Sequence, residues 1–217
     1  MQKPFEKKLR KAEKHLSSAS PKLGCWISEV GRCDLKPVWD REPFESLVRA
    51  VAHQQLHGKA AESILGRMIS RFPNQVFPTA LQLSRMRVTS FRNCGFSMAK
   101  TEAIRGIAKG ACEGVVPSRE TANGMTDEAL VETLTELRGI GKWSVEMLLI
   151  FTMGRLDVMP VDDFGVRAGL THLVGLSETP KKAAFAKWTD SWQPYRSVGA
   201  WYLWRLADAR KLQHTTP

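Results

Sequence analysis

Apolar residues recur at intervals of three and four through most of this chain, and Gly or Pro interrupts the pattern at short distances. In the stretch PFESLVRAVAHQQL, Phe44, Leu47, Val48 and Val51 fall on one face of a helix. Alternating apolar and polar residues followed by hairpin turns, which would indicate strands, are scarce. The sequence therefore predicts an all-α protein built from short amphipathic helices.

The interruptions define where helices begin and end. We expect SSASP (17–21) to be a break and PSRETANG (117–124) to be a loop. The helices are expected over 4–16, 22–31, 43–56 and 59–72, then after Thr79, after Gly95, from 126 or 127 to 137, from the 162–163 pair onward, and on both sides of Pro194.

The charge balance is the unusual feature of the composition. Lys and Arg number 32 against 22 Asp and Glu, which gives a net charge of +10 and a pI near 9.7. A basic protein of this size suggests a polyanionic partner, most often nucleic acid. A basic protein without such a partner is the alternative that charge alone leaves open.

The four cysteines exclude several classes of protein. They form no CxxC pair and have neither metal-ligand nor iron–sulfur spacing, so we expect no metal site and a reducing compartment. No stretch has the apolar length of a signal peptide core or a membrane span. We therefore expect a soluble intracellular protein that does not associate with a membrane.

The segment LRGIGKW (137–143) connects two predicted helices through a turn with two glycines. Gly139 and Gly141 leave no Cβ to block close approach, while Ile140 can anchor the turn in the core. The first amides of the following helix, with Arg138 and Lys142, would bind a phosphate without reading a base. An ordinary helix–turn–helix connection with a glycine C-cap is the alternative.

The longer segment LRGIGKWSVEMLLIFTMGRLDVMPVDD (137–163) resembles the helix–hairpin–helix and Gly/Pro-Asp (HhH-GPD) signature of base-excision DNA glycosylases. Its GIG turn, the following Trp143 and the MPVDD ending are similar to the alkylated-base branch, the 3-methyladenine DNA glycosylase II family. Further similar segments are AVAHQQLHGKAA (50–61), GFSMAKTEAI (95–104) and QPYRSVGAWYLWR (193–205), in the order that the family has them.

The resemblance implies a single all-α domain over 1–217 with two lobes and a central cleft. One lobe is expected over about 44–160, with the helix–hairpin–helix at 127–153, and the other over 1–43 together with 164–217.

The resemblance also implies an activity, the hydrolysis of the N-glycosidic bond of alkylated purines in base excision repair. Related enzymes that also cut the strand have a lysine where this chain has Trp143, so we expect a monofunctional enzyme that leaves an abasic site. Two alternatives stay open: a non-catalytic module that binds bent or damaged DNA, and a glycosylase for hypoxanthine or etheno bases.

The expected partner is double-stranded DNA containing alkylated bases, bound by a monomer. No cofactor is expected to be required, although the family's hairpin carbonyls can hold an optional monovalent cation. The implied location is the cytoplasm of a bacterium or the nucleus of a eukaryote.

One carboxylate is expected to carry the reaction. Breaking the bond leaves positive charge on the sugar, which a nearby carboxylate stabilises. Alignment with the alkylated-base family favours Asp163, with Asp162 as the second choice. Either could cap the helix that begins near Phe164, and for Asp162 capping or bracing of the hairpin is the structural alternative.

The base pocket is expected to be aromatic, because electron-poor alkylated bases stack on aromatic faces. The resemblance assigns Trp143 and Trp204 to the pocket, adds Trp201, and places Met147 where a long bacterial member has an aromatic residue. Packing in the core is the alternative for each tryptophan, and it is the preferred interpretation for Trp26, Trp39, Trp188 and Trp192.

A side chain must fill the gap that a flipped base leaves in the duplex. The resemblance assigns Gln55 and Leu56 to this wedge and places His57 beside the minor groove. Alternatively, Leu56 belongs to the core and His57 is a solvated turn residue.

Overall fold

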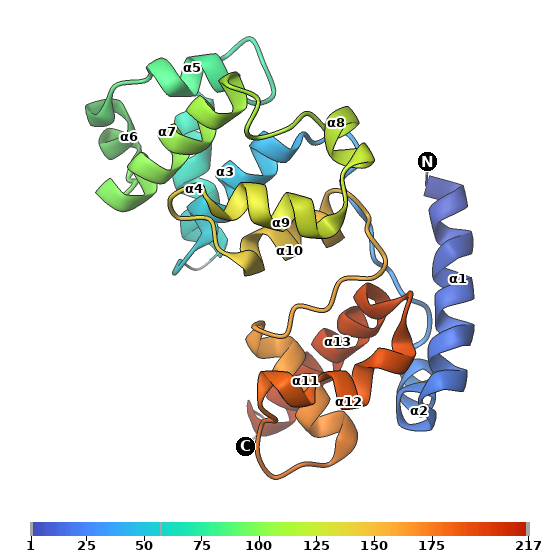
Figure 1. Cartoon of the computed structure of the whole chain (residues 1–217). Coiled ribbons are helices and arrows are strands. Elements are labelled where there is room, and N and C mark those ends of the chain that lie inside the picture. Colours follow the sequence, from blue (N-terminus) through green and yellow to red (C-terminus); the bar gives the residue numbers. More distant parts are fainter. Residues whose placement is uncertain (1, 57, 216–217) are drawn as a thin grey trace. The chain divides into compact units, whose positions relative to one another are not determined.

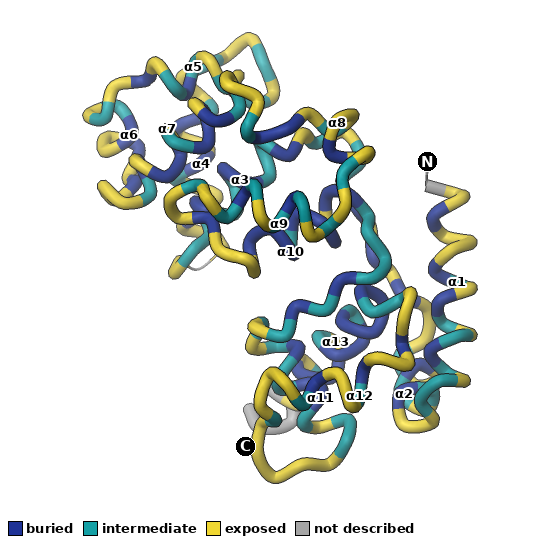
Figure 2. The backbone as a smooth tube through the Cα atoms, viewed as in Figure 1, coloured by how far each residue is buried: buried dark blue, intermediate teal, exposed yellow. Residues whose placement is uncertain are grey.

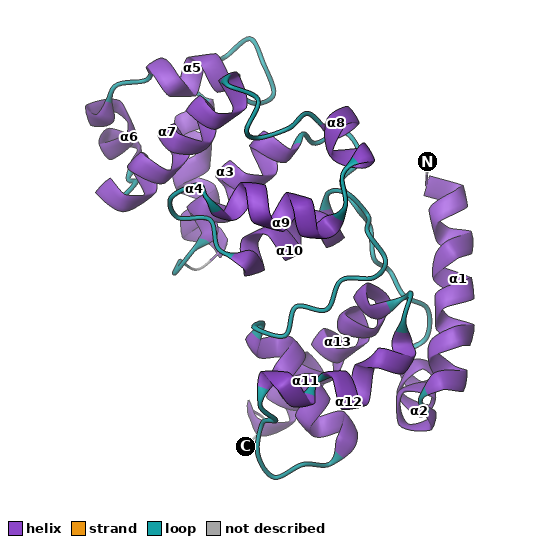
Figure 3. Cartoon of the chain, viewed as in Figure 1, coloured by secondary structure: helices purple, strands orange, loops and turns teal. Residues whose placement is uncertain are grey.

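The computed structural model describes residues 2–56 and 58–215, and the regular structure in these ranges is helical throughout, as predicted (Figure 3). None of the described helices combines the length and the apolar character that a bilayer span requires. The helices and 3-10 turns, in chain order, are α1 (Gln2–Ala19), α2 (Pro21–Val30), α3 (Pro43–His53), α4 (Gly58–Ile69), α5 (Ala80–Arg85), α6 (Val88–Cys94), α7 (Met98–Cys112), α8 (Arg119–Gly124), α9 (Asp127–Thr135), α10 (Lys142–Phe151), α11 (Phe164–Val174), η1 (Lys182–Ala184), α12 (Ala186–Thr189), η2 (Asp190–Trp192) and α13 (Arg196–Thr215) (Figure 1).

The chain divides into two compact units. The hairpin unit comprises residues 40–153, and the terminal unit comprises residues 1–39 and 154–217. The segment 154–160, which we expected in the lobe of the hairpin, belongs to the terminal unit instead, whereas residues 40–43, which we expected in the other lobe, belong to the hairpin unit. A Cβ on Gly154 would lie 2.5 Å from the Trp39 ring, and the Ser197 N–H donates to the Leu156 carbonyl at 2.9 Å. These contacts tie the segment to the terminal unit.

The core of the hairpin unit forms around α3, whose apolar face packs against α4, α7 and α10. The predicted stripe of Leu47, Val48 and Val51 is fully buried, and Figure 2 shows buried positions along the facing helices. Phe44, from the same stripe, lies at the edge of this core and stacks edge-on against Phe77. The helix pattern therefore predicted this core face correctly.

In the terminal unit, α11 and α13 lie unusually close together because of two glycines four residues apart. A Cβ on Gly169 would lie 2.2 Å from the Leu203 carbonyl oxygen, and one on Gly165 would lie 2.7 Å from the Trp204 ring. Residues at this spacing share one face of a helix. The glycines of α11 thus allow α13 to approach backbone to backbone, and α1 and α2 also pack against α13.

Two predicted interruptions are wrong in detail. The expected break over 17–21 is only Ser20, because α1 continues to Ala19 and the Ser20 side chain caps α2 by accepting from the Leu23 N–H. The expected loop over 117–124 contains α8, a single short turn capped by Ser118. Serine residues concealed the end of α1 and the start of α2, and a composition rich in Ser, Asn and Gly concealed α8, since these residues favour caps as well as loops.

Candidate functional site

The glycine turn of the hairpin unit joins α9 to α10, as the sequence predicted. Ile140 is buried and donates its N–H to the Leu137 carbonyl at 3.0 Å, which closes the turn. The N-cap of α10 is Gly141, so no side-chain cap covers the first turn of this helix. The dipole and amides of such a helix start favour an anion.

Only one of the two turn glycines has a backbone conformation and a close contact that require glycine. Gly139 has φ +84°, and a Cβ there would lie 2.8 Å from the Cβ of Ala103 in α7. Gly141 has φ −99° and open space around its Cβ position. Gly139 is therefore required for folding of the turn, whereas the exposed Gly141 permits close approach of a ligand.

Two cations flank the turn and remain accessible. The Arg138 guanidinium pairs with Glu102 at 2.7 Å and stays 77% exposed. The Lys142 ammonium lies 3.8 Å from the buried carboxylate of Glu146, one turn along α10, and stays 58% exposed. Both can reach a phosphate at the mouth of the turn.

The expected wedge lies in the turn between α3 and α4. Gln55 has φ +54°, the only positive φ of a non-glycine residue in the described chain, and Leu56 is 41% exposed. Leu56 is therefore not a core residue. His57, the third expected member, lies outside the described residues. A strained backbone such as that of Gln55 is found most often at functional sites.

Two side chains that the sequence did not single out brace this turn against the hairpin unit. The Gln54 side-chain amide donates to the Gly139 carbonyl at 3.0 Å, which links the wedge turn to the glycine turn. The Lys100 ammonium donates to the Ala52 carbonyl at 2.8 Å, and partial burial lowers the pKa of Lys100. Both belong to segments that carry the family resemblance, and that is the only sequence signal that could have indicated them.

Asp163 lies in the terminal unit as the N-cap of α11. Its Oδ1 accepts the Val166 N–H at 2.9 Å and the Trp204 indole N–H at 2.7 Å, while the carboxylate stays half-buried. Its own N–H donates to the Pro160 carbonyl at 3.0 Å, so the proline-containing turn sets the backbone as well. Two donors thus orient the carboxylate, and a third hydrogen bond fixes the backbone of the same residue.

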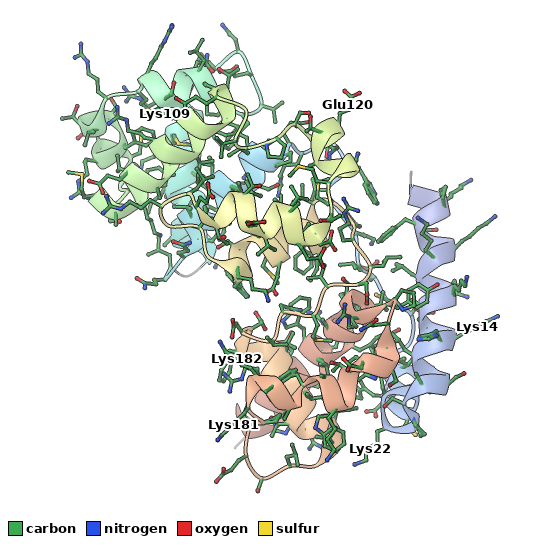
Figure 4. All side chains as sticks on the ribbon, viewed as in Figure 1. Lys14, Lys22, Lys109, Glu120, Lys181 and Lys182 are labelled. Carbon is green, nitrogen blue, oxygen red and sulfur yellow. The ribbon has the colours of Figure 1, made fainter. Side chains whose placement is uncertain are left out.

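Asp162 has a different environment, although it is the adjacent residue. It is exposed and forms an ion pair with Lys182, which Figure 4 labels together with its neighbour Lys181. Asp162 does not cap α11, so the expectation that either aspartate could serve as the cap is resolved in favour of Asp163.

The segment that precedes Asp163 is fixed to the start of α13. The Arg196 guanidinium donates to Oδ1 of Asp157 at 2.8 Å and to Oδ2 at 3.0 Å, and the Ser197 hydroxyl accepts the Val158 N–H at 2.9 Å. A bidentate arginine–carboxylate pair restricts geometry more than a single contact does. The loop that delivers the acid is therefore rigidly attached to the helix that carries Trp204.

The four expected pocket residues are divided between the two units. Trp204 contacts Asp163 directly, whereas Trp201 stacks edge-on against Tyr202 and lies beneath the Arg205 guanidinium at 5.4 Å. In the hairpin unit, Trp143 is 39% exposed near the start of α10, and the half-buried Met147 follows one turn later.

The other tryptophans mostly pack, as expected. Trp192 is buried against Gly199, Trp39 stacks edge-on with Phe5, and the Trp26 indole donates to the Tyr202 carbonyl at 3.0 Å.

Comparison with known proteins places this geometry in a family. The model of the HhH-GPD superfamily base excision DNA repair proteins matches residues 48–194. The chain is 41% identical over 207 residues to DNA-3-methyladenine glycosylase 1 of Schizosaccharomyces pombe, a match that covers 94% of this chain and 91% of that protein.

Solved structures support the same family assignment. The Schizosaccharomyces pombe 3-methyladenine DNA glycosylase Mag1, solved in complex with abasic DNA, superposes with a TM-score of 0.82 at 40% identity, covering 95% of this chain and all (100%) of that chain. A DNA-3-methyladenine glycosidase from Bacillus halodurans superposes with a TM-score of 0.84 at 31% identity, covering 93% and 91% of the two chains. The chain belongs to the HhH-GPD superfamily of base excision DNA repair proteins, in its 3-methyladenine DNA glycosylase branch.

Proposed function

We propose that this protein is a monofunctional DNA glycosylase that releases alkylated purines of the 3-methyladenine type from double-stranded DNA and leaves an abasic site. One observation carries the proposal: the half-buried Asp163 carboxylate, oriented by the Trp204 indole and the Val166 amide. An acid held this way beside an aromatic ring suits a reaction in which a flat, electron-poor base leaves a sugar that becomes positively charged.

The reaction needs little acid assistance, because an alkylated base already carries positive charge. The C1′–N bond breaks with its electron pair leaving on the base, and the Asp163 carboxylate stabilises the sugar cation. Water then adds to C1′ and gives up a proton. At ~4 Å and an effective dielectric of about 20, the carboxylate supplies up to roughly 4 kcal/mol.

In this proposal the hairpin unit binds the DNA backbone. The start of α10 at Gly141, with Lys142 and Arg138 beside it, holds a backbone phosphate without reading sequence. Leu56, exposed on a strained turn that Gln54 ties to the hairpin, enters the duplex where the base has left.

The monovalent cation stays optional in this proposal, and two of the hairpin carbonyls that could hold it already accept hydrogen bonds. The Gly139 carbonyl accepts from Gln54, and the Gly141 carbonyl accepts the N–H groups of Ser144 and Val145. No step of the proposed reaction needs a cation there.

The test measures bases released from methylated DNA by chromatography. Asp163→Asn is expected to reduce 3-methyladenine release by about 1000-fold, the rate equivalent of roughly 4 kcal/mol. Asp162→Asn, the matched control, is expected to stay within a few-fold of wild type, because its carboxylate is engaged by Lys182. Unchanged release by the Asp163 variant would contradict the proposal.

The same assay separates the alternatives. If the wild type binds methylated DNA but releases nothing, the protein is a non-catalytic binding module. If it releases hypoxanthine or etheno bases faster than 3-methyladenine from a panel of defined lesions, the substrate class is different while the mechanism stands.

A further inference from the structure

The middle of the hairpin unit is strongly biased in charge. Between Glu62 and Glu102 the sequence contains no Asp or Glu at all, and its six cations are Arg67, Arg71, Arg85, Arg87, Arg92 and Lys100. Three of them donate hydrogen bonds to backbone carbonyls within the unit. Arg67 and Arg92 donate to the carbonyls of Cys94 and Phe96, respectively, and Lys100 donates to the carbonyl of Ala52. The remaining three are Arg71, Arg85 and Arg87.

These three arginines surround one shallow hollow of about 370 Å³, which we call the arginine hollow. Arg71 follows the end of α4, Arg85 ends α5, and Arg87 is the N-cap residue of α6. All three side chains are exposed, and no ion pair within the described parts of the chain involves any of them. Three cations gathered without a counter-charge repel one another unless an anion joins them.

The arginine hollow is separate from the glycine turn and the wedge. The wedge precedes the first residue of α4, Gly58, whereas Arg71 lies beyond its last residue, Ile69. A helix of 12 residues is about 18 Å long at ~1.5 Å per residue. The two features therefore lie at opposite ends of α4, and Figure 1 shows α5 and α6 at the end of the unit away from the start of α4.

The geometry points to a second nucleic-acid contact: we infer that the arginine hollow binds the phosphate backbone of a DNA duplex that is not the one held at the lesion site. The inference rests on the proposed action on DNA and adds a site to it. Guanidinium groups match phosphate oxygens with paired donors. Such a contact is independent of sequence and would hold the protein near DNA while the hairpin unit inspects another segment.

The lining favours a phosphate backbone over an acidic protein partner. Among the residues that line the hollow, Met86 is buried and Phe72 is half-buried, so the residues that it exposes fully are the three arginines. Protein partners usually need an apolar anchor in the centre of the interface, whereas DNA backbone contacts consist chiefly of charge and hydrogen bonds.

The experiment first saturates the full-length protein with a short duplex that carries a stable abasic analogue. A longer, undamaged, labelled duplex is then titrated in at several salt concentrations. The wild type is expected to bind this second duplex. The combined variant Arg71→Gln, Arg85→Gln and Arg87→Gln is expected to make the negative slope of log affinity against log salt shallower by about 2.7, because each phosphate that the protein no longer neutralises reduces its magnitude by about 0.9.

The matched control is Lys7→Gln, Lys8→Gln and Lys11→Gln, which removes the same charge from exposed positions on α1. It is expected to keep the slope, and both variants are expected to excise from a short lesion duplex at the wild-type rate. Arg85→Gln alone, expected to reduce the magnitude of the slope by about 0.9, gives the same test if the combined variant does not fold.

Three results would overturn the inference: no second duplex bound by the wild type, an equal loss in the α1 control, or displacement of the labelled duplex by polyglutamate as effectively as by unlabelled DNA. The last result would assign the arginine hollow to an acidic protein partner. Failure of the wild type to release any base would refute the proposed function instead, and the second-duplex titration would still be interpretable.

Discussion

The indole N–H of Trp204 donates a 2.7 Å hydrogen bond to Oδ1 of Asp163 and so joins the middle of α13 to the N-cap of α11. The same oxygen accepts the Val166 amide, so both of its lone-pair directions are used. Gly165, with no side chain, leaves room for the Trp204 ring beside the acid. Orientation of the carboxylate therefore depends on a helix contact as well as on its own cap.

Trp204→Phe should lower glycosylase activity while leaving the fold intact. The substitution keeps an aromatic face but removes the N–H donor to the carboxylate, and a hydrogen bond to a charged group contributes about 1.5–3 kcal/mol. We expect kcat/KM for base release to fall by about 10- to 100-fold. Trp188→Phe is the control, since Trp188 is not an expected pocket residue and contacts Lys187 rather than the acid. Equal losses in both variants would contradict an orienting role for the indole.

Gly169→Ala should destabilise the terminal unit strongly. Its Cβ would lie 2.2 Å from the Leu203 carbonyl oxygen, so α11 and α13 would have to separate. We expect the free energy of unfolding to fall by about 3 kcal/mol or more, measured by urea denaturation. Gly66→Ala, on an exposed face of α4 with open space around it, should instead raise it by about 0.5–1 kcal/mol. A small effect at Gly169 would refute the close approach of the two helices.

The sequence predicted the helical class and the buried stripe of α3 because both depend on local spacing. It also predicted a buried Ile140 and a helix starting after Asp163, since turn glycines and capping aspartates are local signals. The short α8 was missed because its six residues carry too little periodicity to outweigh a composition rich in Ser, Asn and Gly.

Contacts between distant residues could not be predicted from one sequence. Trp204 follows Asp163 by 41 positions, and Gly139 follows Gln54 by 85. No local pattern encodes either pair, although the spacing of Gly165 and Gly169 could have indicated a face of α11 that another helix approaches. The allocation of 154–160 was wrong for the same reason, because its partners are Trp39 and the start of α13.

The two turn glycines should respond differently to alanine. Gly139→Ala forces a side chain into φ +84° and against Ala103, so we expect a loss of about 1–3 kcal/mol in unfolding free energy together with weaker DNA binding. Gly141→Ala should cost less than about 1 kcal/mol in stability, because its φ is ordinary, yet weaken DNA binding by crowding the start of α10. Thermal denaturation and fluorescence anisotropy measure the two effects. Full affinity in the Gly141 variant would show that no phosphate approaches that backbone.

Alkaline pH should destabilise the protein through Cys33, a thiol in the core of the terminal unit. Burial raises the pKa of Cys33 from 9.0 to about 12, so the folded state keeps a proton that the unfolded state loses first. The contribution of the neutral thiol to stability is complete below pH 9.0 and is lost as the pH rises toward about 12. Relative to Cys33→Ala, the free energy of unfolding of the wild type should therefore fall by up to about 1.4 kcal/mol per pH unit above this threshold. Groups whose pKa does not depend on Cys33 cancel in this difference, and the cavity left by alanine adds only an offset that does not vary with pH. Parallel stability curves for the two proteins from about pH 8 to about pH 10 would mean that Cys33 is not protonated preferentially by folding.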